Sequence, residues 1–286
     1  MKIFILPTPE IAMPGNQVNT YPLHNQDFGV EQDFFEFLKN NPRLQTADPS
    51  KADWHYLPIY WTRWHVNHDY AKTGLSELQN YVDDAIINSK ITFTICQYDD
   101  GPVVNTGDTT QLLASRKSYF GIDIPLLSSA HRIPWFAPRK KTILASFVGR
   151  LSTHKLRQEM AQHLSKVSGV SIVDSSQGTG RYVNIMLRSH IALCPRGYGG
   201  SSFRFFEAMQ LGVVPFLIGD QDVRPFKNKI DWEKISIYTD SPAKISRILD
   251  KYSTDQLLSM GKAARLVWQN QLTYQKWCNL ALEELK

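Results

Sequence analysis

The sequence has few cysteines and lacks a long apolar run. Its three cysteines, Cys96, Cys194 and Cys278, form neither a CxxC pair nor a metal-ligand spacing, which argues against a disulfide framework and a cysteine-based metal site. The first apolar run, in MKIFILPTPE, ends at Pro7 and is too short for a signal peptide or a membrane span of about 20 residues. We therefore expect a soluble, cytoplasmic protein without a membrane anchor.

Blocks of like charge are also missing. The net charge of +5 is spread over 286 residues without a run of five like charges, which argues against a tail that binds nucleic acid or a membrane surface. The hydrophobic content of 42% is sufficient for a sizeable core. The length fits one large domain or two of medium size.

Short apolar runs alternate with stretches of helical period in the first half of the chain. Strands are expected at residues 2–6, 55–60 and 91–96, and helices at 31–41 and 75–89. This β-α-β-α-β order predicts a parallel sheet with helices on both faces. A further strand is expected near 118–124, followed by a linker at 133–139.

The same pattern restarts after the linker. Strands are expected at 143–149, 170–174, 190–194, 213–220 and 235–238, and helices at 155–167, 181–189, 203–211, 242–250 and 254–285. The sequence thus predicts two α/β domains, at residues 1–135 and 136–265. A C-terminal helix at 266–286 is expected to pack back towards the first domain. Ligands of parallel sheets bind beyond the carboxyl ends of the strands, so the natural site is a cleft between the two domains.

The stretch CPRGYGGSSFRFFEAM, residues 194–209, joins an expected strand to an expected helix. Its glycines allow backbone N–H groups to converge on a ligand, and the helix N-terminus adds partial positive charge, which together favour an anion such as phosphate. Arg204 would add a charged contact to phosphate, and Glu207 could accept hydrogen bonds from ribose hydroxyls. The alternative is that Arg204 and Glu207 form a surface pair three residues apart. The stretch is neither GxGxxG nor a P-loop, which weakens dehydrogenase and ATPase interpretations.

Four segments together resemble the exostosin-type glycosyltransferases, known as GT47 enzymes. They are TADPSKADWHYLPIY (46–60), FVGR (147–150), LCPRGYG (193–199) and SSFRFFEAMQLGVVPFLIGD (201–220). The resemblance covers most of residues 27–265 and is looser in the first half. Cellular members are longer and carry an N-terminal Golgi membrane anchor, so this chain looks more like the compact, soluble members of large algal viruses.

The resemblance implies a GT-B fold, in which two Rossmann-like domains with parallel sheets face a central cleft. It also implies transfer, with inversion, of a sugar from a nucleotide-sugar donor, UDP-linked (such as UDP-xylose), to a hydroxyl of an oligosaccharide or glycoprotein glycan. The donor-binding residues it implies are Arg150, Arg157, Arg196, Gly197, Ser201, Ser202, Arg204 and Glu207. Arg150 has an alternative role as a surface residue beside a helix.

An inverting transfer needs a base that takes the proton of the acceptor hydroxyl. Asp99 and Asp100 follow the expected strand at 91–96 and precede a glycine, as in the family, although DDG is also a common turn sequence. Asp69, in the stretch 61–70, is the next candidate. Glu31 is a further possibility, with a helix first-turn acid as the stronger alternative.

Aromatic residues cluster just before and within 61–70. Trp61, Trp64 and His65 are expected to bind the acceptor, because sugars stack on aromatic rings, although core packing is the likelier fate of at least half of the cluster. DQD at 220–222 resembles the metal motif of another glycosyltransferase fold, but it follows an expected strand here. We predict no required metal or other cofactor, because arginines and a helix N-terminus supply the positive charge.

Two other functions fit the same residues. The chain could be a non-catalytic module that binds carbohydrate or nucleotide, or a nucleotide-sugar epimerase of GT-B architecture. If both loop aspartates, Asp99 and Asp100, can be replaced without loss of any activity, the binding module is favoured. If the nucleotide sugar turns over without an acceptor, the epimerase is favoured.

Overall fold

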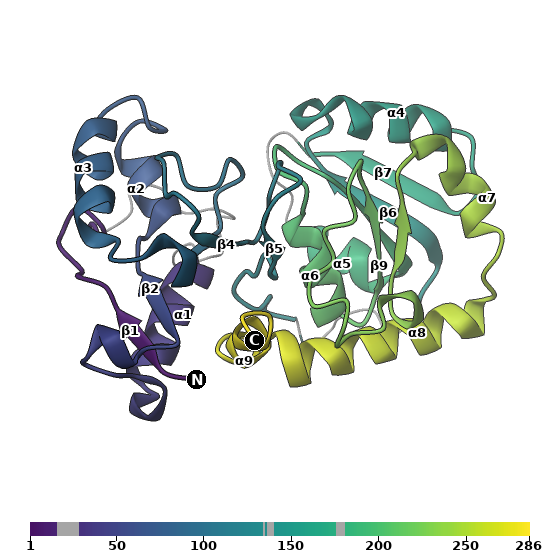
Figure 1. Ribbon diagram of the computed structural model, residues 1–286. Helices are drawn as coiled ribbons and strands as arrows, with labels where there is room; N and C mark the ends of the chain where they lie inside the picture. Colours follow the sequence, from purple (N-terminus) through teal and green to yellow (C-terminus); the bar gives the residue numbers. More distant parts are fainter. Residues whose placement is uncertain (16–28, 134, 136–139, 176–180) are drawn as a thin grey trace. The chain divides into compact units, whose positions relative to one another are not determined.

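The computed structural model describes residues 1–15, 29–133, 135, 140–175 and 181–286. Most of the linker predicted at 133–139 lies outside these residues. The chain forms two compact units (Figure 1): unit 1 comprises Met1–Ser129 and Tyr274–Lys286, and unit 2 comprises Ala130–Thr273. In the described residues each unit contains a parallel sheet of five strands, which confirms the predicted α/β class with two parallel sheets.

The sheet of unit 1 follows the chain order. Its strands are β1 (Ile3–Ile5), β2 (Trp54–Leu57), β3 (Thr92–Cys96), β4 (Thr110–Leu113) and β5 (Ile122–Asp123), and every neighbouring pair is parallel. β3 is buried along its whole length, as expected for a central strand of a parallel sheet covered on both faces. The prediction missed β4, whose sequence TQLL is too short to show a period of its own.

Helices cover both faces of this sheet. On one face, Phe34 of α1 (Gly29–Lys39) packs its ring against those of Tyr56 and Phe93, with centroids 5.2 and 5.7 Å apart. On the other face, α2 (Trp61–Asn67) and α3 (Leu75–Ala85) share a core with Leu57 and Cys96. Three 3₁₀ turns, Pro42–Leu44, Pro49–Lys51 and Ser89–Ile91, complete the connections.

Two sequence-based expectations for connecting segments are wrong. The stretch 61–70 is expected to form a loop after the second expected strand. Residues 61–67 instead form the helix α2, because Trp61 and Trp64 lie one turn apart and both enter the core. The single helix expected at 254–285 is interrupted. α8 (Thr254–Val267) is followed by the π-helical turn Trp268–Leu272, and Gln275 has a φ of +65°, so α9 (Lys276–Glu283) starts in a new direction.

The sheet of unit 2 has the order β10-β9-β8-β6-β7, all parallel. Its strands are β6 (Ile143–Gly149), β7 (Val170–Asp174), β8 (Ser189–Pro195), β9 (Val214–Ile218) and β10 (Ile237–Thr239). Its remaining helices are α4 (Lys155–Leu164), α5 (Tyr182–Leu187), α6 (Phe203–Gln210) and α7 (Ile245–Leu249), with 3₁₀ turns at Leu151–Thr153, Trp232–Lys234 and Pro242–Lys244. Apolar residues of α4, α7 and α8 form one core with β6, β8, β9 and β10.

A single carboxylate ties α9 to α1 within unit 1. Asp33 of α1 accepts hydrogen bonds from the backbone N–H of Gln275, at 2.6 Å, and from the indole N–H of Trp277, at 2.7 Å. Trp277 is fully buried and its ring lies 5.8 Å from that of Phe34. Burial raises the pKa of Asp33, and the hydrogen bonds from Gln275 and Trp277 oppose the shift without reversing it.

Replacing Asp33 by alanine is expected to destabilise unit 1 by about 3 kcal/mol, because two N–H donors lose their acceptor in a half-buried position. Chemical denaturation followed by tryptophan fluorescence measures the loss. Asp84→Ala, at an exposed position of α3, is the matched control and should change the midpoint little. Equal midpoints for the two variants would show that the Asp33 contacts do not hold α9.

Candidate active site

The strand order of unit 2 reverses beside β6. The chain passes from β6 to β7 on one side and then crosses to β8 on the other side of β6. The carboxyl ends of β6 and β8 therefore diverge into loops on opposite sides of a crevice, which is where open α/β sheets bind ligands. Arg150 directly follows β6, and Arg196 directly follows β8. The topology thus brings the predicted donor-binding segments to one edge of one sheet.

Arg157 of α4 joins the two loops at this edge. Its Nε donates to the carbonyl of Arg196 and its Nη1 to the carbonyl of Arg150, both at 3.0 Å. The residue is 9% exposed, and its guanidinium lies over the ring of Phe147, 5.7 Å from the centroid. A Cβ at Gly197 would lie 3.2 Å from Nη2 of Arg157, so the glycine lets the loop after β8 pass close to this arginine.

Arg204, in the first turn of α6, reaches the end of β6. Its Nη2 donates to the carbonyl of Val148 at 2.5 Å, and its guanidinium stacks 4.4 Å from the centroid of Phe147. A Cβ at Gly149 would lie 2.5 Å from Nη2 of Arg204. Only glycine at 149 therefore allows this arginine to approach β6, which explains the FVGR sequence in physical terms.

Two guanidinium groups at this edge carry a donor without an acceptor. The Nε atoms of Arg196 and Arg204 are buried and have no hydrogen-bond partner among the residues that the structure describes. Arg196 is 7% exposed; its Nη1 pairs with Asp220, and its Nη2 donates to the carbonyl of Tyr198 at 3.2 Å. Because buried polar groups are normally satisfied, these two donors can hydrogen-bond a ligand with anionic oxygens.

The N-terminus of α6 faces the same loop. Ser202 is its N-cap in an extended conformation, but its side chain makes no capping hydrogen bond to the N–H groups of the first turn. Ser201 and Ser202 are 6% and 7% exposed. Arg150 is exposed and contributes its carbonyl to Arg157. Residues 150, 157, 196, 197, 201, 202 and 204 thus all belong to the end of the sheet at which β6 and β8 diverge.

Glu207 is buried one turn further along α6, at 5% exposure, so it is not the surface partner of Arg204 that the sequence allowed. The hydroxyl of Tyr182 donates to Oε2, and Nε2 of His131 lies 3.0 Å from Oε1. Burial alone would raise the pKa of Glu207, but the contacts with His131 and Tyr182 and the charge of Arg204 lower it overall. Glu207 is therefore held as a carboxylate, and sequence reasoning missed its two partners because they lie far from it along the chain.

The predicted bases all belong to unit 1. Asp99 and Asp100 lie in a tight turn after β3, closed by a hydrogen bond from the N–H of Gly101 to the carbonyl of Tyr98, at 3.0 Å. Asp100 pairs with Lys117 at 2.5 Å, and its side chain is 50% exposed. Asp69 follows α2 with a φ of +49° and pairs with Lys72 at 2.9 Å. Asp69 thus belongs to a surface turn after α2, whereas Asp99 and Asp100 directly follow the sheet.

Glu31 has a different environment. It is fully buried and accepts hydrogen bonds from the N–H of Thr62 at 3.0 Å, the hydroxyl of Thr62 at 2.9 Å and the N–H of Gln97 at 2.8 Å. These contacts hold the segments that follow β2 and β3 to α1. The carboxylate positions the loop that carries Asp99.

The aromatic residues predicted to bind the acceptor pack the interior of unit 1. Trp61 and Trp64 are fully buried, and the indole N–H of Trp61 donates to the hydroxyl of Thr94 at 2.9 Å. His65 is 2% exposed and stacks on Tyr98 with centroids 3.7 Å apart. A sugar has no free ring face to stack on at these positions, so core packing, the alternative role, describes them better.

The buried ring of His65 gives unit 1 a pH dependence. Burial lowers the pKa of His65 to about 4, and neither ring nitrogen has a hydrogen-bond partner in the described part of the chain. Below about pH 6.5 the unfolded chain binds a proton that the folded unit excludes, so stability decreases as the pH falls from about 6.5 to about 4.

His65→Phe should therefore keep the stability near neutral pH and lose less of it on acidification, because phenylalanine retains the stacking on Tyr98 and cannot be protonated. The difference from wild type should grow by about 1.4 kcal/mol per pH unit below pH 6. Denaturation midpoints between pH 7 and 4.5 provide the measurement. His163→Gln, at an exposed position, controls for the loss of an ordinary histidine; parallel pH curves for all three proteins would refute the assignment.

Both aspartates of the DQD segment form ion pairs. Asp220 pairs with Arg196, and Asp222 pairs with Arg224 at 2.9 Å and with Lys227 at 3.4 Å. Among the described residues, no group of three or more His, Cys, Asp or Glu side chains could hold a metal ion. Within the same residues, none of the helices is both long and apolar enough to span a membrane.

The chain thus folds into two units, each with a parallel sheet. Buried arginines and a glycine-rich loop lie at the switch point of the sheet in unit 2. The family model of the Exostosin GT47 domain matches residues 1–251. The chain belongs to this exostosin family.

Individual relatives agree with this assignment. The chain is 34% identical over 263 residues to the probable glycosyltransferase At3g07620 of Arabidopsis thaliana, covering 76% of this chain and 53% of the relative. It is 25% identical over 273 residues to the probable glucuronosyltransferase 47 A of Physcomitrium patens, covering 78% and 59%. It thus spans little more than half the length of these curated relatives. The crystal structure of AviGT4, a glycosyltransferase involved in avilamycin A biosynthesis, aligns at 13% identity and a TM-score of 0.40, covering 99% of this chain and 96% of AviGT4.

Proposed function

We propose that the protein is an inverting glycosyltransferase that moves a sugar from a nucleotide diphosphate sugar to a hydroxyl of a glycan. Unit 2 binds the donor and unit 1 supplies the base. Family membership supports the class of reaction, and the UDP-linked donor follows from the resemblance to that family. UDP-xylose and UDP-glucuronate, the latter suggested by the name of the Physcomitrium relative, are the first donors to test.

The observation that carries the proposal is the pair of buried Nε donors of Arg196 and Arg204, which have no hydrogen-bond partner within the described ranges of the chain. They accompany the N-terminus of α6, whose N-cap side chain makes no capping hydrogen bond. A diphosphate has the negative charge and the oxygen acceptors that these groups require. Glu207, held as a carboxylate one turn later beside Tyr182 and His131, is the proposed acceptor of hydrogen bonds from ribose hydroxyls.

The reaction is a single displacement. A carboxylate of unit 1 takes the proton of the acceptor hydroxyl while the hydroxyl oxygen bonds to C1 of the donor sugar. The bond from C1 to the diphosphate oxygen breaks at the same time, and its electron pair leaves with the diphosphate. Attack on the face opposite to the leaving group inverts the anomeric centre.

Charge builds on the departing diphosphate, and fixed positive groups lower the energy of that state. Arg196, Arg204 and the N-terminus of α6 are already oriented by backbone contacts before the donor binds. We propose that they serve in place of a metal ion. Asp220 and Asp222, the carboxylates that could suggest a metal, each neutralise an arginine.

Arg204→Lys should weaken UDP binding about tenfold, because one ammonium group cannot hold the carbonyl of Val148 and also contact phosphate as a planar guanidinium does. Thermal-shift titration with UDP, UDP-xylose and UDP-glucuronate measures the affinity. Arg188→Lys is the matched control, since Arg188 is exposed at the amino end of β8 and contacts Thr142.

Equal affinities of the two lysine variants would remove Arg204 from the donor site. If no UDP-, GDP- or ADP-linked sugar shifts the unfolding temperature of the wild-type protein, the donor site itself is disproved. A ligand at 100 times its dissociation constant should stabilise the protein by about 2.7 kcal/mol, which a thermal shift detects.

Loss of the base should slow transfer by about 10²–10⁴ and leave UDP affinity unchanged. We expect this of Asp99→Asn or Asp100→Asn before Asp69→Asn, because the first two follow β3, whereas Asp69 lies in a surface turn beyond α2. UDP release in the presence and absence of a glycan acceptor measures the three variants side by side.

The pattern of losses discriminates among the functions. If only Asp69→Asn loses transfer activity, the base lies in the segment after α2. Turnover without an acceptor would favour the epimerase. A protein that binds UDP-sugars but transfers nothing in any form would be the binding module.

A further inference from the structure

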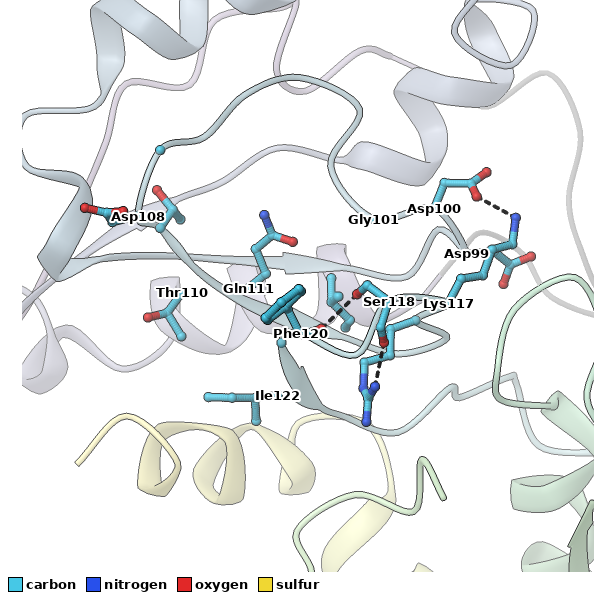
Figure 2. Close-up of a pocket in the computed structure, with 15 residues that line it drawn as sticks. Asp99, Asp100, Gly101, Asp108, Thr110, Gln111, Lys117, Ser118, Phe120 and Ile122 are labelled. Carbon is cyan, nitrogen blue, oxygen red and sulfur yellow. Dashed lines mark hydrogen bonds and ion pairs between the residues drawn. The ribbon is translucent and has the colours of Figure 1, made fainter. Parts of the chain in front are cut away.

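Unit 1 contains a cavity of about 600 Å³ that runs along β4, from the loop before this strand to the turn that follows β3. All of its lining residues fall between 99 and 122, in the turn after β3, in β4 with its preceding loop, and in the segment that leads to β5 (Figure 2). Its volume lies within the range of about 300–1,000 Å³ that is typical of small-molecule sites. The cavity belongs to one unit and includes both predicted bases, Asp99 and Asp100.

The segment between β4 and β5 is held in a fixed conformation. Arg116 forms two hydrogen bonds with Asp123, at 2.7 and 3.0 Å, and a third with the carbonyl of Ser118, at 2.6 Å. A Cβ at Gly121, where φ is +99°, would lie 2.8 Å from a side-chain atom of Leu113 and 3.1 Å from the carbonyl oxygen of Gln111. Glycine is therefore required for this segment to lie against β4.

This fixed segment presents the ring of Phe120 at the cavity. Phe120 is 85% exposed although the cavity lining includes it, and its carbonyl accepts a hydrogen bond from the hydroxyl of Ser118 at 2.9 Å. Because the ring is exposed and also lines the cavity, a ligand bound in the cavity can cover its face. The flat ring suits the apolar C–H face of a sugar.

Polar side chains flank the ring. Figure 2 shows Asp108, Thr110 and Gln111 on one side of Phe120, and Asp99 and Asp100 on the other. The lining contains three carboxylates against two cations, Arg116 and Lys117. Both cations already have carboxylate partners, in Asp123 and Asp100. An anionic ligand would meet net negative charge here, whereas a neutral sugar offers hydroxyl donors to the carboxylates.

We propose that this cavity is the acceptor site, that Phe120 is its stacking platform, and that it selects a neutral sugar residue over a uronate. The inference rests on the proposed glycosyltransferase function. The proposal assigns the stacking role to Phe120 in place of Trp61 and Trp64, which are buried. The ring of Phe120 is exposed and lines the same cavity as the predicted bases.

Ligand-observed NMR with the full chain tests the proposal directly. The probes are the neutral trisaccharides cellotriose, xylotriose and mannotriose, with trigalacturonate as the anionic comparison. Tyr119→Ala is the matched control for Phe120→Ala, because Tyr119 is the adjacent residue and is 81% exposed but does not line the cavity. Both side chains are exposed, so neither change should impair folding.

We expect at least one neutral trisaccharide to bind wild type and Tyr119→Ala equally, and Phe120→Ala to raise its dissociation constant about tenfold. Trigalacturonate should bind more weakly than the neutral probe. The proposal is overturned if no neutral probe binds, if Phe120→Ala binds as wild type does, or if trigalacturonate binds best. UDP titration of the same proteins separates the two hypotheses: unchanged UDP binding keeps the proposed function whatever the glycan result, and absent UDP binding removes it.

Discussion

Buried charge at the carboxyl edge of the sheets is the constraint on which the candidate site depends. In unit 2, Arg157 of α4 hydrogen-bonds the carbonyls of Arg150 and Arg196, and Arg204 of α6 bonds the carbonyl of Val148. A guanidinium is costly to bury without acceptors, so these carbonyls and the loops that carry them are held in place. The Nε donors of Arg196 and Arg204, which lack an acceptor in the part of the chain that the structure describes, are the groups that we propose for the diphosphate.

Unit 1 uses a charge of opposite sign in the same way. The buried carboxylate of Glu31 in α1 accepts hydrogen bonds from the backbone of Thr62, just after β2, and of Gln97, just after β3. In each unit, one charged side chain of a helix thus forms hydrogen bonds with backbone groups just after two strands. These bonds fix the loops that follow the strands. Loop residues fixed by such contacts can position reacting groups more precisely than residues of loops whose backbone groups are hydrogen-bonded only to water.

Burial decides which aromatic rings of unit 1 are accessible to a ligand. Trp61 and Trp64 have the composition expected of a sugar platform, but they lie one helical turn apart and fill the core beneath the sheet. Phe120 has no such periodicity around it, and its exposure follows from the Arg116–Asp123 pair that holds its segment in place. Residue type alone therefore could not show which rings are accessible to a ligand.

The sequence by itself determined the two-sheet α/β class and most strands and helices, and it marked the segment between β8 and α6 as unusual, because apolar periodicity and a glycine-rich strand-to-helix joint are local properties. Only the tertiary structure decided which side chains are accessible and what they contact. The burial of Glu207 with Tyr182 and His131, the unpaired Nε of Arg196, and the short strand β4 beside the cavity all depend on residues distant in the chain. Such contacts arise from strand order and packing, which leave no local pattern in the sequence.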